Sequence, residues 1–367
     1  MNMQIPVPRI FTSSRLLVFA SFPDFADNTY AFYLYLEENR YWEKYQFVWL
    51  VEEVTDSIMA MVKERKFHCQ VIKKKSVKGV LAFLRCKHFF TSHGGFLNFD
   101  TSKVTDKYVN LWHGMPLKRI GRLLYDDFGF RPNLTIASSS AFQKVMSACF
   151  NLPLEKALVI GQPRCDMMSR ETDFFENRGI KVSSYTKVGM WMPTYRVSII
   201  GDIRQDGSYQ EGSVSFLSKE DILQLDGFLR GKNVLLLLKI HPMDVLQNYN
   251  FPNYTNIEVI KPREADSELY PILGKCDFLM TDYSSVYIDY EVLSRPIGFV
   301  MDDLAEYSSS RGFCFEHIED VMPGRVLINL EEVEAFIDKP EFTSCSVQLN
   351  DYHDFDSSRR LTESLKL

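Results

Sequence analysis

Histidines and paired hydroxyls stand directly behind apolar runs in this sequence, where they could support group transfer. His113 follows one such run, His241 follows another, and Ser284 and Ser285 follow a third. In open parallel sheets, ligands bind in the crevice outside the carboxyl ends of the strands. If the apolar runs are strands of such sheets, the spacing predicts that these side chains line a ligand site.

His113 is the candidate base. Gly114, the next residue, would let the backbone approach a ligand closely, and Lys118 adds positive charge just beyond. A histidine with a pKa near neutrality can deprotonate an attacking hydroxyl. A histidine that only packs between domains is the alternative interpretation of this position.

His241 is the candidate partner of a leaving group. It follows the apolar run 234–240, and Pro242 ends that run and holds its neighbour extended. A protonated histidine here could neutralise a diphosphate leaving group or donate a proton to it. A hydrogen-bonded structural histidine is the alternative.

A phosphate site is expected where Ser284 or Ser285 caps a helix that runs to about Leu293. Unpaired N–H groups and the positive end of the helix dipole make such a terminus suitable for phosphate. A plain helix cap, which needs no ligand, is the alternative. Arg196 and Arg311 could add bidentate phosphate contacts, although single arginines are also common on surfaces.

Other cofactor chemistry finds little support. The sequence contains no GxxxxGK[ST] loop, GxGxxG fingerprint, HExxH pair or GxSxG elbow. The one Asp-x-Asp, at 354–356, follows no predicted strand and is therefore a poor candidate for clamping a metal-bound nucleotide. We expect no tightly bound cofactor and no protein-bound metal, with charge stabilised by His, Arg and helix N–H groups; a need for Mg²⁺ stays open.

Short apolar runs alternate with amphipathic stretches along the chain, which predicts βαβ units and parallel sheets. The predicted strands are 16–20, 47–51, 88–92, 109–112 and 157–161, then 187–192, 234–240, 278–282 and 296–300. Helical patterns cover 28–39, 56–65 and 139–150. A polar stretch at 170–185 separates the two series, so we expect domains over 1–175 and 186–345 and a tail or helix over 346–367.

Composition bounds the class of protein. The chain has 367 residues, 46% of them hydrophobic, which suits two domains of about 150–200 residues each. A net charge of −6 argues against nucleic-acid binding, yet the stretch 63–87 holds nine Lys or Arg and one acidic residue. Seven scattered cysteines without a CxxC pair favour a reducing cytoplasm. No signal peptide or long apolar span is evident, so any membrane contact is expected to be peripheral.

The polar motifs occur in a fixed order along the chain. They are NLWHGMPLKRIG at 110–121, GQPRCD at 161–166, MPTYR at 192–196, LKIHP at 238–242, TDYSSV at 281–286, RPIGF at 295–299, EY at 306–307 and RGF at 311–313. Together, these motifs closely resemble the CDP-glycerol glycerophosphotransferase family, whose enzymes prime or polymerise teichoic acids and related capsule polymers of the cell wall. The resemblance covers roughly residues 88 to 315 and rests on the order of the motifs.

The resemblance implies an α/β, GT-B-like architecture of two Rossmann-like domains facing across a cleft. The N-terminal domain would lie on the acceptor side, and the C-terminal domain would hold CDP-glycerol or CDP-ribitol. An acceptor hydroxyl would attack the β-phosphorus, so that glycerol or ribitol phosphate is transferred and CMP released. His113 matches a proposed base of the family, and His241 matches a histidine near the donor diphosphate.

The expected site residues divide into two groups. Those on the donor and phosphate side are Arg196, Lys239, Asp282, Ser284, Ser285, Glu306 and Arg311, with Glu306 in a loop that covers the donor. Those on the acceptor side are His93, Gly114, Lys118 and Arg164. Two departures from the family pattern, Met115 for a threonine and the GQPRCD motif for GYPRND, bear on the acceptor and the polyol more than on the reaction class.

The family's acceptors are commonly polymers or carried on a polyprenyl diphosphate in the membrane. This implies a cytoplasmic protein that docks peripherally on the inner face of the membrane through the stretch 63–87; an ordinary solvated helix face is the alternative. Two other functions stay open: a GT-B glycosyltransferase that uses a nucleotide sugar, and a non-catalytic relative that binds a nucleotide or polymer. Release of CMP, rather than a nucleoside diphosphate, would separate the two enzymes.

Overall fold

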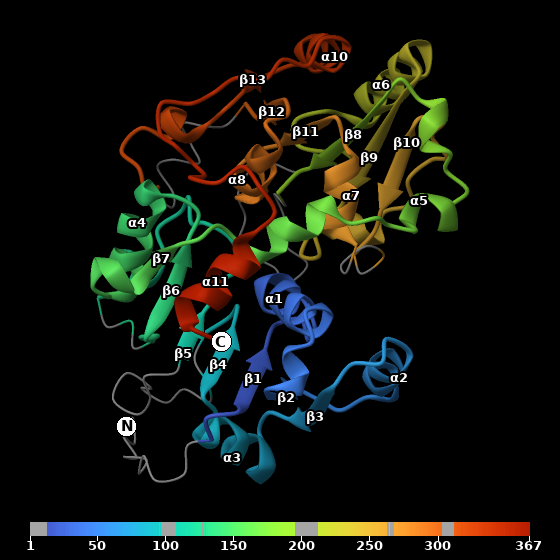
Figure 1. Ribbon diagram of the computed structural model, residues 1–367. Coiled ribbons are helices and arrows are strands. Elements are labelled where there is room, and N and C mark those ends of the chain that lie inside the picture. The colour runs from blue at the N-terminus through green and yellow to red at the C-terminus, as the bar shows by residue number, and fades with distance from the viewer. Residues whose placement is uncertain are drawn as a thin grey trace. The chain divides into compact units, whose positions relative to one another are not determined.

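The computed structural model describes residues 13–94, 96, 108–126, 128, 130–194, 212–262, 264, 268–302 and 312–367. Two compact units divide the chain (Figure 1). The first unit combines Met1–Asp166 with Asp354–Leu367, and the second unit is Met167–His353.

The described part of the first unit contains a seven-stranded sheet in the order β3-β2-β1-β4-β5-β6-β7, with every pair of neighbours parallel. Its strands are β1 Leu16–Ala20, β2 Gln46–Val51, β3 Cys69–Lys73, β4 His88–Thr91, β5 Tyr108–Asn110, β6 Leu134–Ala137 and β7 Ala157–Val159. Its helices are α1 Asp27–Glu38, α2 Asp56–Glu64, α3 Val77–Arg85, α4 Ser140–Phe150 and α11 Ser357–Leu365.

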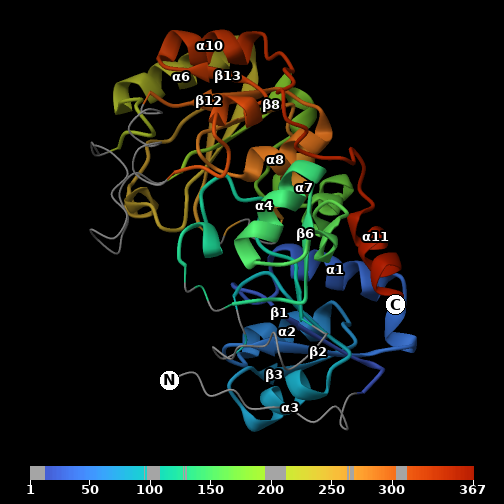
Figure 2. The same cartoon turned by 90° about the vertical axis from the view of Figure 1, so that its left-hand side faces the viewer.

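Helices cover both faces of this sheet, which is why its inner strand β1 is apolar throughout. All five residues of β1 are buried, as expected for a strand covered on both sides. Val18 packs in one cluster with Phe83 of α3, whereas Phe19 points to the other face and contacts Tyr33 of α1, with ring centroids 5.3 Å apart. Figure 2 shows α4 beside β6, in agreement with their contacts.

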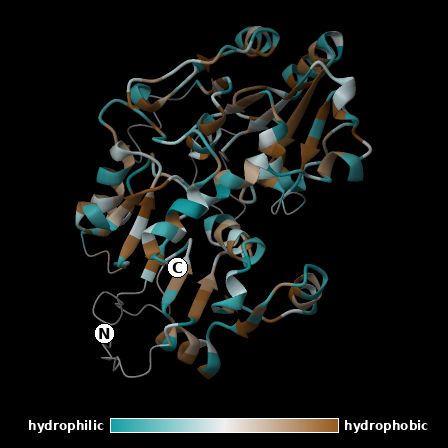
Figure 3. Ribbon diagram, in the orientation of Figure 1, coloured by the Kyte–Doolittle hydropathy of each residue, from teal (hydrophilic) through white to brown (hydrophobic). Residues whose placement is uncertain are grey.

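The described part of the second unit repeats this construction with six parallel strands in the order β10-β9-β8-β11-β12-β13. The strands are β8 Lys187–Met192, β9 Val234–Lys239, β10 Ile257–Ile260, β11 Phe278–Thr281, β12 Ile297–Val300 and β13 Arg325–Leu327. The helices are α5 Phe174–Asn177, α6 Lys219–Lys232, α7 Leu269–Lys275, α8 Val286–Tyr290 and α10 Leu330–Asp338. Both sheets are strongly hydrophobic along their strands (Figure 3). The predicted α/β class with two parallel sheets is confirmed.

The chain passes from the first unit to the second after Asp166 and returns after His353, and neither point lies in the polar stretch 170–185 that was expected as the linker. The stretch expected as a linker, 170–185, lies in the second unit and is packed there. Phe174 and Phe175 of α5 are buried, and Arg178 forms ion pairs with Glu258 and Glu264. The expected tail 346–367 is divided at Asp354, because α11 returns to the first unit.

Asp166 holds that returning helix. Its carboxylate accepts hydrogen bonds from the first two backbone N–H groups of α11, those of Ser357 at 2.9 Å and Ser358 at 2.8 Å. An anion at a helix N-terminus is favoured by the orphan N–H groups and the dipole. Gly161 makes room for the contact, since a Cβ there would lie 2.4 Å from the Ser357 hydroxyl.

Hydropathy gives one further result. Within the described ranges, no helix combines the length and the apolar character that crossing a membrane requires.

Candidate active site

The segment that carries His113 leaves β5 through a strained turn. Trp112 has a φ of +49° and Gly114 a φ of +128°. The second value suits glycine, which adopts positive φ readily. The predicted close approach of a ligand to Gly114 stays a prediction. For a tryptophan, left-handed backbone costs on the order of 1–3 kcal/mol and persists only where the surroundings hold it.

A backbone carbonyl sets the tautomer of His113. Its Nδ1 lies 2.9 Å from the carbonyl oxygen of Ser92, which directly follows β4. A carbonyl oxygen can only accept a hydrogen bond, so Nδ1 carries the hydrogen and Nε2 of the neutral ring is unprotonated. The side chain keeps solvent exposure. His113 therefore presents a basic nitrogen where a hydroxyl can reach it.

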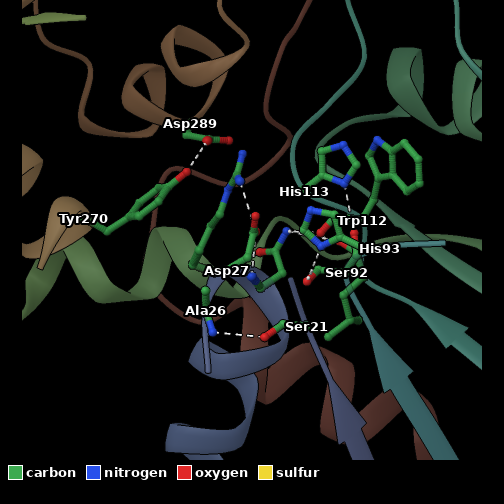
Figure 4. A network of polar contacts seen from close by, with 12 residues as sticks. Ser21, Ala26, Asp27, Ser92, His93, Trp112, His113, Tyr270 and Asp289 are labelled. Atoms are coloured by element: carbon green, nitrogen blue, oxygen red, sulfur yellow. Dashed lines mark hydrogen bonds and ion pairs between the residues drawn. The ribbon is translucent and has the colours of Figure 1, made fainter. Parts of the chain in front are cut away.

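Two aromatic rings accompany His113 (Figure 4). His93 stacks on it with ring centroids 4.4 Å apart and planes 12° apart, and Trp112 lies at 4.1 Å. Surrounding protein lowers the pKa of His113, an effect only partly offset by the bond to the Ser92 carbonyl. Burial, and then the neighbouring His113, lower the pKa of His93 to about 4. Both rings are therefore neutral near pH 7, the state that a base requires.

Arg164 is tied into the fold of the first unit. It is buried, and its Nη1 lies 3.0 Å from Oδ1 of Asp27. Its backbone N–H donates to Oδ1 of Asn28 at 3.0 Å. The charges of Asp27 and Arg164 act on the pKa of His113 in opposite directions. Arg164 thus lies close enough to His113 to act on its electrostatics, and its predicted role on the acceptor side stays a prediction.

The remaining predicted residues of this loop differ in exposure. Gly114 is buried and Lys118 is half-buried. Met115, which stands where the family usually has threonine, is fully buried. The threonine hydroxyl of the family pattern is thus replaced by a side chain that packs in the core. The Met115 side chain is not exposed beside His113.

His241 in the second unit holds the opposite tautomer. It follows β9 in a turn in which the N–H of Asp244 donates to the carbonyl of His241 at 2.9 Å. The N–H of Met243 donates to Nδ1 of His241 at 3.0 Å. Because Nδ1 accepts, the hydrogen of the neutral ring resides on Nε2. The Nε2 atom of His241 can therefore donate a hydrogen bond, whereas the Nε2 atom of His113 can accept a proton.

Two predicted donor-side residues lie at the ends of β9 and β11, the two strands that flank β8. Lys239 is the last residue of β9 and is buried. Asp282 follows β11, and its two carboxylate oxygens each lie 3.0 Å from the N–H of Thr194, whose hydroxyl donates to Oδ2 at 2.9 Å. Asp282 therefore joins the ends of β11 and β8, which are paired in the sheet.

The serine pair does not form the predicted cap in the expected way. α8 begins at Val286 with Ser285 as its N-cap, but the Ser285 side chain makes no capping bond. Its backbone is helical (φ −65°, ψ −4°), whereas a capping side chain needs an extended N-cap. Ser284 Oγ instead accepts from the N–H of Val286 at 3.4 Å. A 3-10 turn, Glu291–Leu293, completes the predicted helix.

Three predicted residues, Arg196, Glu306 and Arg311, lie outside the described residues. Among those that are described, no group of three His, Cys, Asp or Glu side chains is placed to hold a metal ion.

Sequence reasoning missed Asp27, Asn28 and Asp166 as parts of this site and its support. One signal could have found the first two. Asp27 and Asn28 are polar residues at the start of the helical pattern that follows the predicted strand 16–20, and the start of such a helix lies at the carboxyl end of the strand before it.

Two doubly wound parallel sheets with polar residues after their strands form an α/β architecture of the GT-B type. The model of the CDP-glycerol:poly(glycerophosphate) glycerophosphotransferase family matches residues 2–365. The chain therefore belongs to this family and is a transferase of its class.

Relatives and solved structures agree. The chain is 28% identical to the teichoic acid glycerol-phosphate transferase of Staphylococcus aureus over 86% of this chain and 82% of that protein. It is 25% identical to a teichoic acid poly(glycerol phosphate) polymerase of Bacillus spizizenii, covering 96% and 92% of the two chains. A polymerase of the same description from Staphylococcus epidermidis is longer, and the match spans 44% of it.

The structure of the wall teichoic acid polymerase TagF has the same fold. It superposes with a TM-score of 0.70 and 20% identity, over 97% of this chain and 89% of that one. A TagF variant soaked with CDPG superposes with a TM-score of 0.67 and 21% identity, over 98% and 90%.

Proposed function

We propose that this protein transfers glycerol phosphate from CDP-glycerol to an acceptor hydroxyl in the synthesis of a teichoic-acid-like polymer, and releases CMP. The observation that carries the proposal is the pair of opposite tautomers, with a basic Nε2 on His113 and a donating Nε2–H on His241. The names of the relatives supply the donor and the polymer.

In the proposed reaction, the proton of the acceptor hydroxyl passes to Nε2 of His113. The hydroxyl oxygen forms a bond to the β-phosphorus of the donor. The bond between that phosphorus and the bridging oxygen breaks, and its electron pair leaves with CMP. His241 stabilises the charge on the departing phosphate through Nε2–H.

The second unit is proposed to bind the donor. Lys239 would contribute charge, and the half-buried hydroxyls of Ser284 and Ser285 would donate to phosphate oxygens. Asp282, as an anion, would act indirectly by fixing Thr194. Arg196, Glu306 and Arg311 are proposed for the same side on the family resemblance alone. CDP-ribitol is the alternative donor.

The first unit is proposed to receive the acceptor, a polymer or a polyprenyl-diphosphate-linked primer. His93 and Lys118 would border the hydroxyl, and Gly114 would allow the backbone to approach it. Arg164, held by Asp27, would act through the electrostatics of His113.

We further propose that the exposed face of α3 docks on an anionic membrane. Within the basic stretch 63–87, α3 exposes the apolar side chains of Val77 (77%) and Leu81 (50%). Exposed apolar side chains among lysines suit a lipid interface. This would bring the enzyme to a membrane-linked acceptor.

The three consecutive lysines at 73–75 are not the best probe of this surface. Lys73 pairs with Glu53 at 2.5 Å, and Lys74 and Lys75 lie 3.4 and 3.6 Å from Glu52. Reversing their charge would disturb these pairs as well as any lipid contact.

The apolar side chains give a sharper test. The double variant Val77→Glu, Leu81→Glu should sediment less with phosphatidylglycerol vesicles than the wild type. Leu154→Glu is the matched control, because Leu154 is an apolar residue of the first unit with 46% exposure outside this surface. Equal sedimentation of all three proteins would contradict membrane docking.

The function itself is tested by incubation with CDP-glycerol or CDP-ribitol and candidate acceptors. CMP is followed by chromatography and the product by mass. Acceptor-dependent release of CMP supports the proposal. Release of a nucleoside diphosphate from a nucleotide sugar, with none of CMP from either CDP-polyol, would favour a glycosyltransferase instead.

A further inference from the structure

Two buried asparagines hold the strained backbone before His113. Asn28, at the start of α1, donates from Nδ2 to the carbonyl oxygens of Leu111 and Trp112, both at 3.0 Å. Asn110, at the end of β5, accepts the N–H of Trp112 on its Oδ1 at 3.0 Å. Both asparagines are fully buried. The peptide groups on either side of Trp112 are therefore each bonded to an asparagine side chain.

The orientation of the Asn28 amide follows from its partners. Nδ2 faces two carbonyl oxygens, which can only accept, and Oδ1 faces the backbone N–H of Arg164 at 3.0 Å. A carboxamide supplies two donors and an acceptor at once. Aspartate would lack the donors and leucine would lack all three contacts, so the position requires this side chain chemistry.

We propose that Asn28, together with Asn110, is a positioning residue that keeps Trp112 in its left-handed conformation and so aims His113 at the Ser92 carbonyl. The role of His113 as base rests on the proposed function, but its position and titration do not. Asn28 is fully buried and bonds the carbonyl groups of Leu111 and Trp112, so it acts through the backbone of the turn.

Loss of the Asn28 amide has a defined consequence for His113. Without its two donors, Trp112 can relax to negative φ, and the imidazole then leaves Ser92 and becomes more hydrated. The titratable or charged groups that act on the ring are His93, Asp27 and Arg164. Burial is the largest influence and lowers the pKa of His113. Greater hydration should therefore raise that pKa toward its ordinary value.

The direct test is a histidine titration of the substrate-free protein. Each of the seven histidines gives one ring Cε1 signal in ¹³C-labelled protein, and His113→Gln identifies that of His113. We expect the pKa of His113 to rise in Asn28→Ala and to stay at the wild-type value in Asn39→Ala. Asn39 is the matched control, since it lies just past the other end of α1 and its amide donates to the Tyr35 carbonyl, on the same helix. An unchanged pKa in folded Asn28→Ala would overturn the proposal.

Kinetics supply the second readout. In Asn28→Ala, kcat should fall about 10- to 100-fold while KM for CDP-glycerol changes little, because misplacing a catalytic group by about 1 Å can cost 100-fold in rate. Asn110→Ser weakens the bond to the Trp112 N–H. It should also raise the pKa of His113 and lower kcat. If Asn28→Ala does not fold, Asn110→Ser takes its place in both measurements. Wild-type kcat in both folded variants would contradict the role. If the wild type released no CMP, the proposed function would fail while the titration still decided this inference.

Discussion

The carbonyl oxygen of Ser92 lies 2.9 Å from Nδ1 of His113 and thereby leaves Nε2 as the basic nitrogen of the ring. Ser92 follows β4 and His113 follows β5, and these two strands are paired in parallel. The sheet itself therefore brings the carbonyl to the imidazole. The chemistry of the proposed base depends on this backbone contact.

The pH dependence of activity follows from the lowered pKa of His113. The base is active when unprotonated, so activity should persist below pH 6.5, where an ordinary histidine is largely protonated. It should be lost as the pH falls through the lowered pKa. The acid limb of kcat/KM for CMP release measures this. A limb above pH 6.5 would contradict the assignment.

His93 should make the protein sensitive to acid. Its pKa is about 4 in the folded state and about 6.5 when unfolded. Between these values the unfolded chain binds more protons, so stability falls as the pH falls, by on the order of 2–3 kcal/mol. His93→Asn should flatten this part of the curve in urea unfolding at each pH. The same slope in the variant would assign the effect to other groups.

His241→Ala should lower kcat by about 100-fold or more, since proton donation and charge stabilisation each contribute on this scale. It should also weaken binding of CDP-glycerol, as measured by calorimetry. Met243→Ala is the control, because it keeps the backbone N–H that bonds His241. Full activity of His241→Ala would remove His241 from the mechanism.

Asp166→Ala should destabilise the protein by about 1–2 kcal/mol, because the first N–H groups of α11 lose their acceptor. Asp166→Asn keeps one acceptor oxygen and should cost less. Asp173→Ala is the control, since Asp173 is an exposed N-cap without a side-chain bond. Chemical unfolding of the three variants checks the order, and an Asp166→Ala protein as stable as the control would refute the capping role.

The alternation of strands and helices was predictable because buried parallel strands are apolar along their whole length. β1 and β8 have the predicted bounds. The sequence missed four strands. Three of them, β3, β10 and β13, are outer strands of their sheets and are partly exposed. Polar residues therefore interrupt the apolar pattern of these three strands. The fourth, β6, has only four residues and leads directly into α4.

The placement of His113 and His241 at strand ends was likewise predictable, but their protonation was not. Each tautomer is set by a backbone group whose position depends on the folded chain. Asn28 shows the same limit more strongly, because it bonds residues 83, 84 and 136 positions away. A contact between such distant residues leaves no local pattern in one sequence.

The most direct test of the central claim compares wild type with His113→Ala for acceptor-dependent release of CMP from CDP-glycerol. The wild type should release CMP as the product gains glycerol phosphate. His113→Ala should be slower by about 100- to 10,000-fold and still bind CDP-glycerol. Equal rates in the two proteins, with CDP-glycerol consumed by both, would contradict the role of His113 as the base.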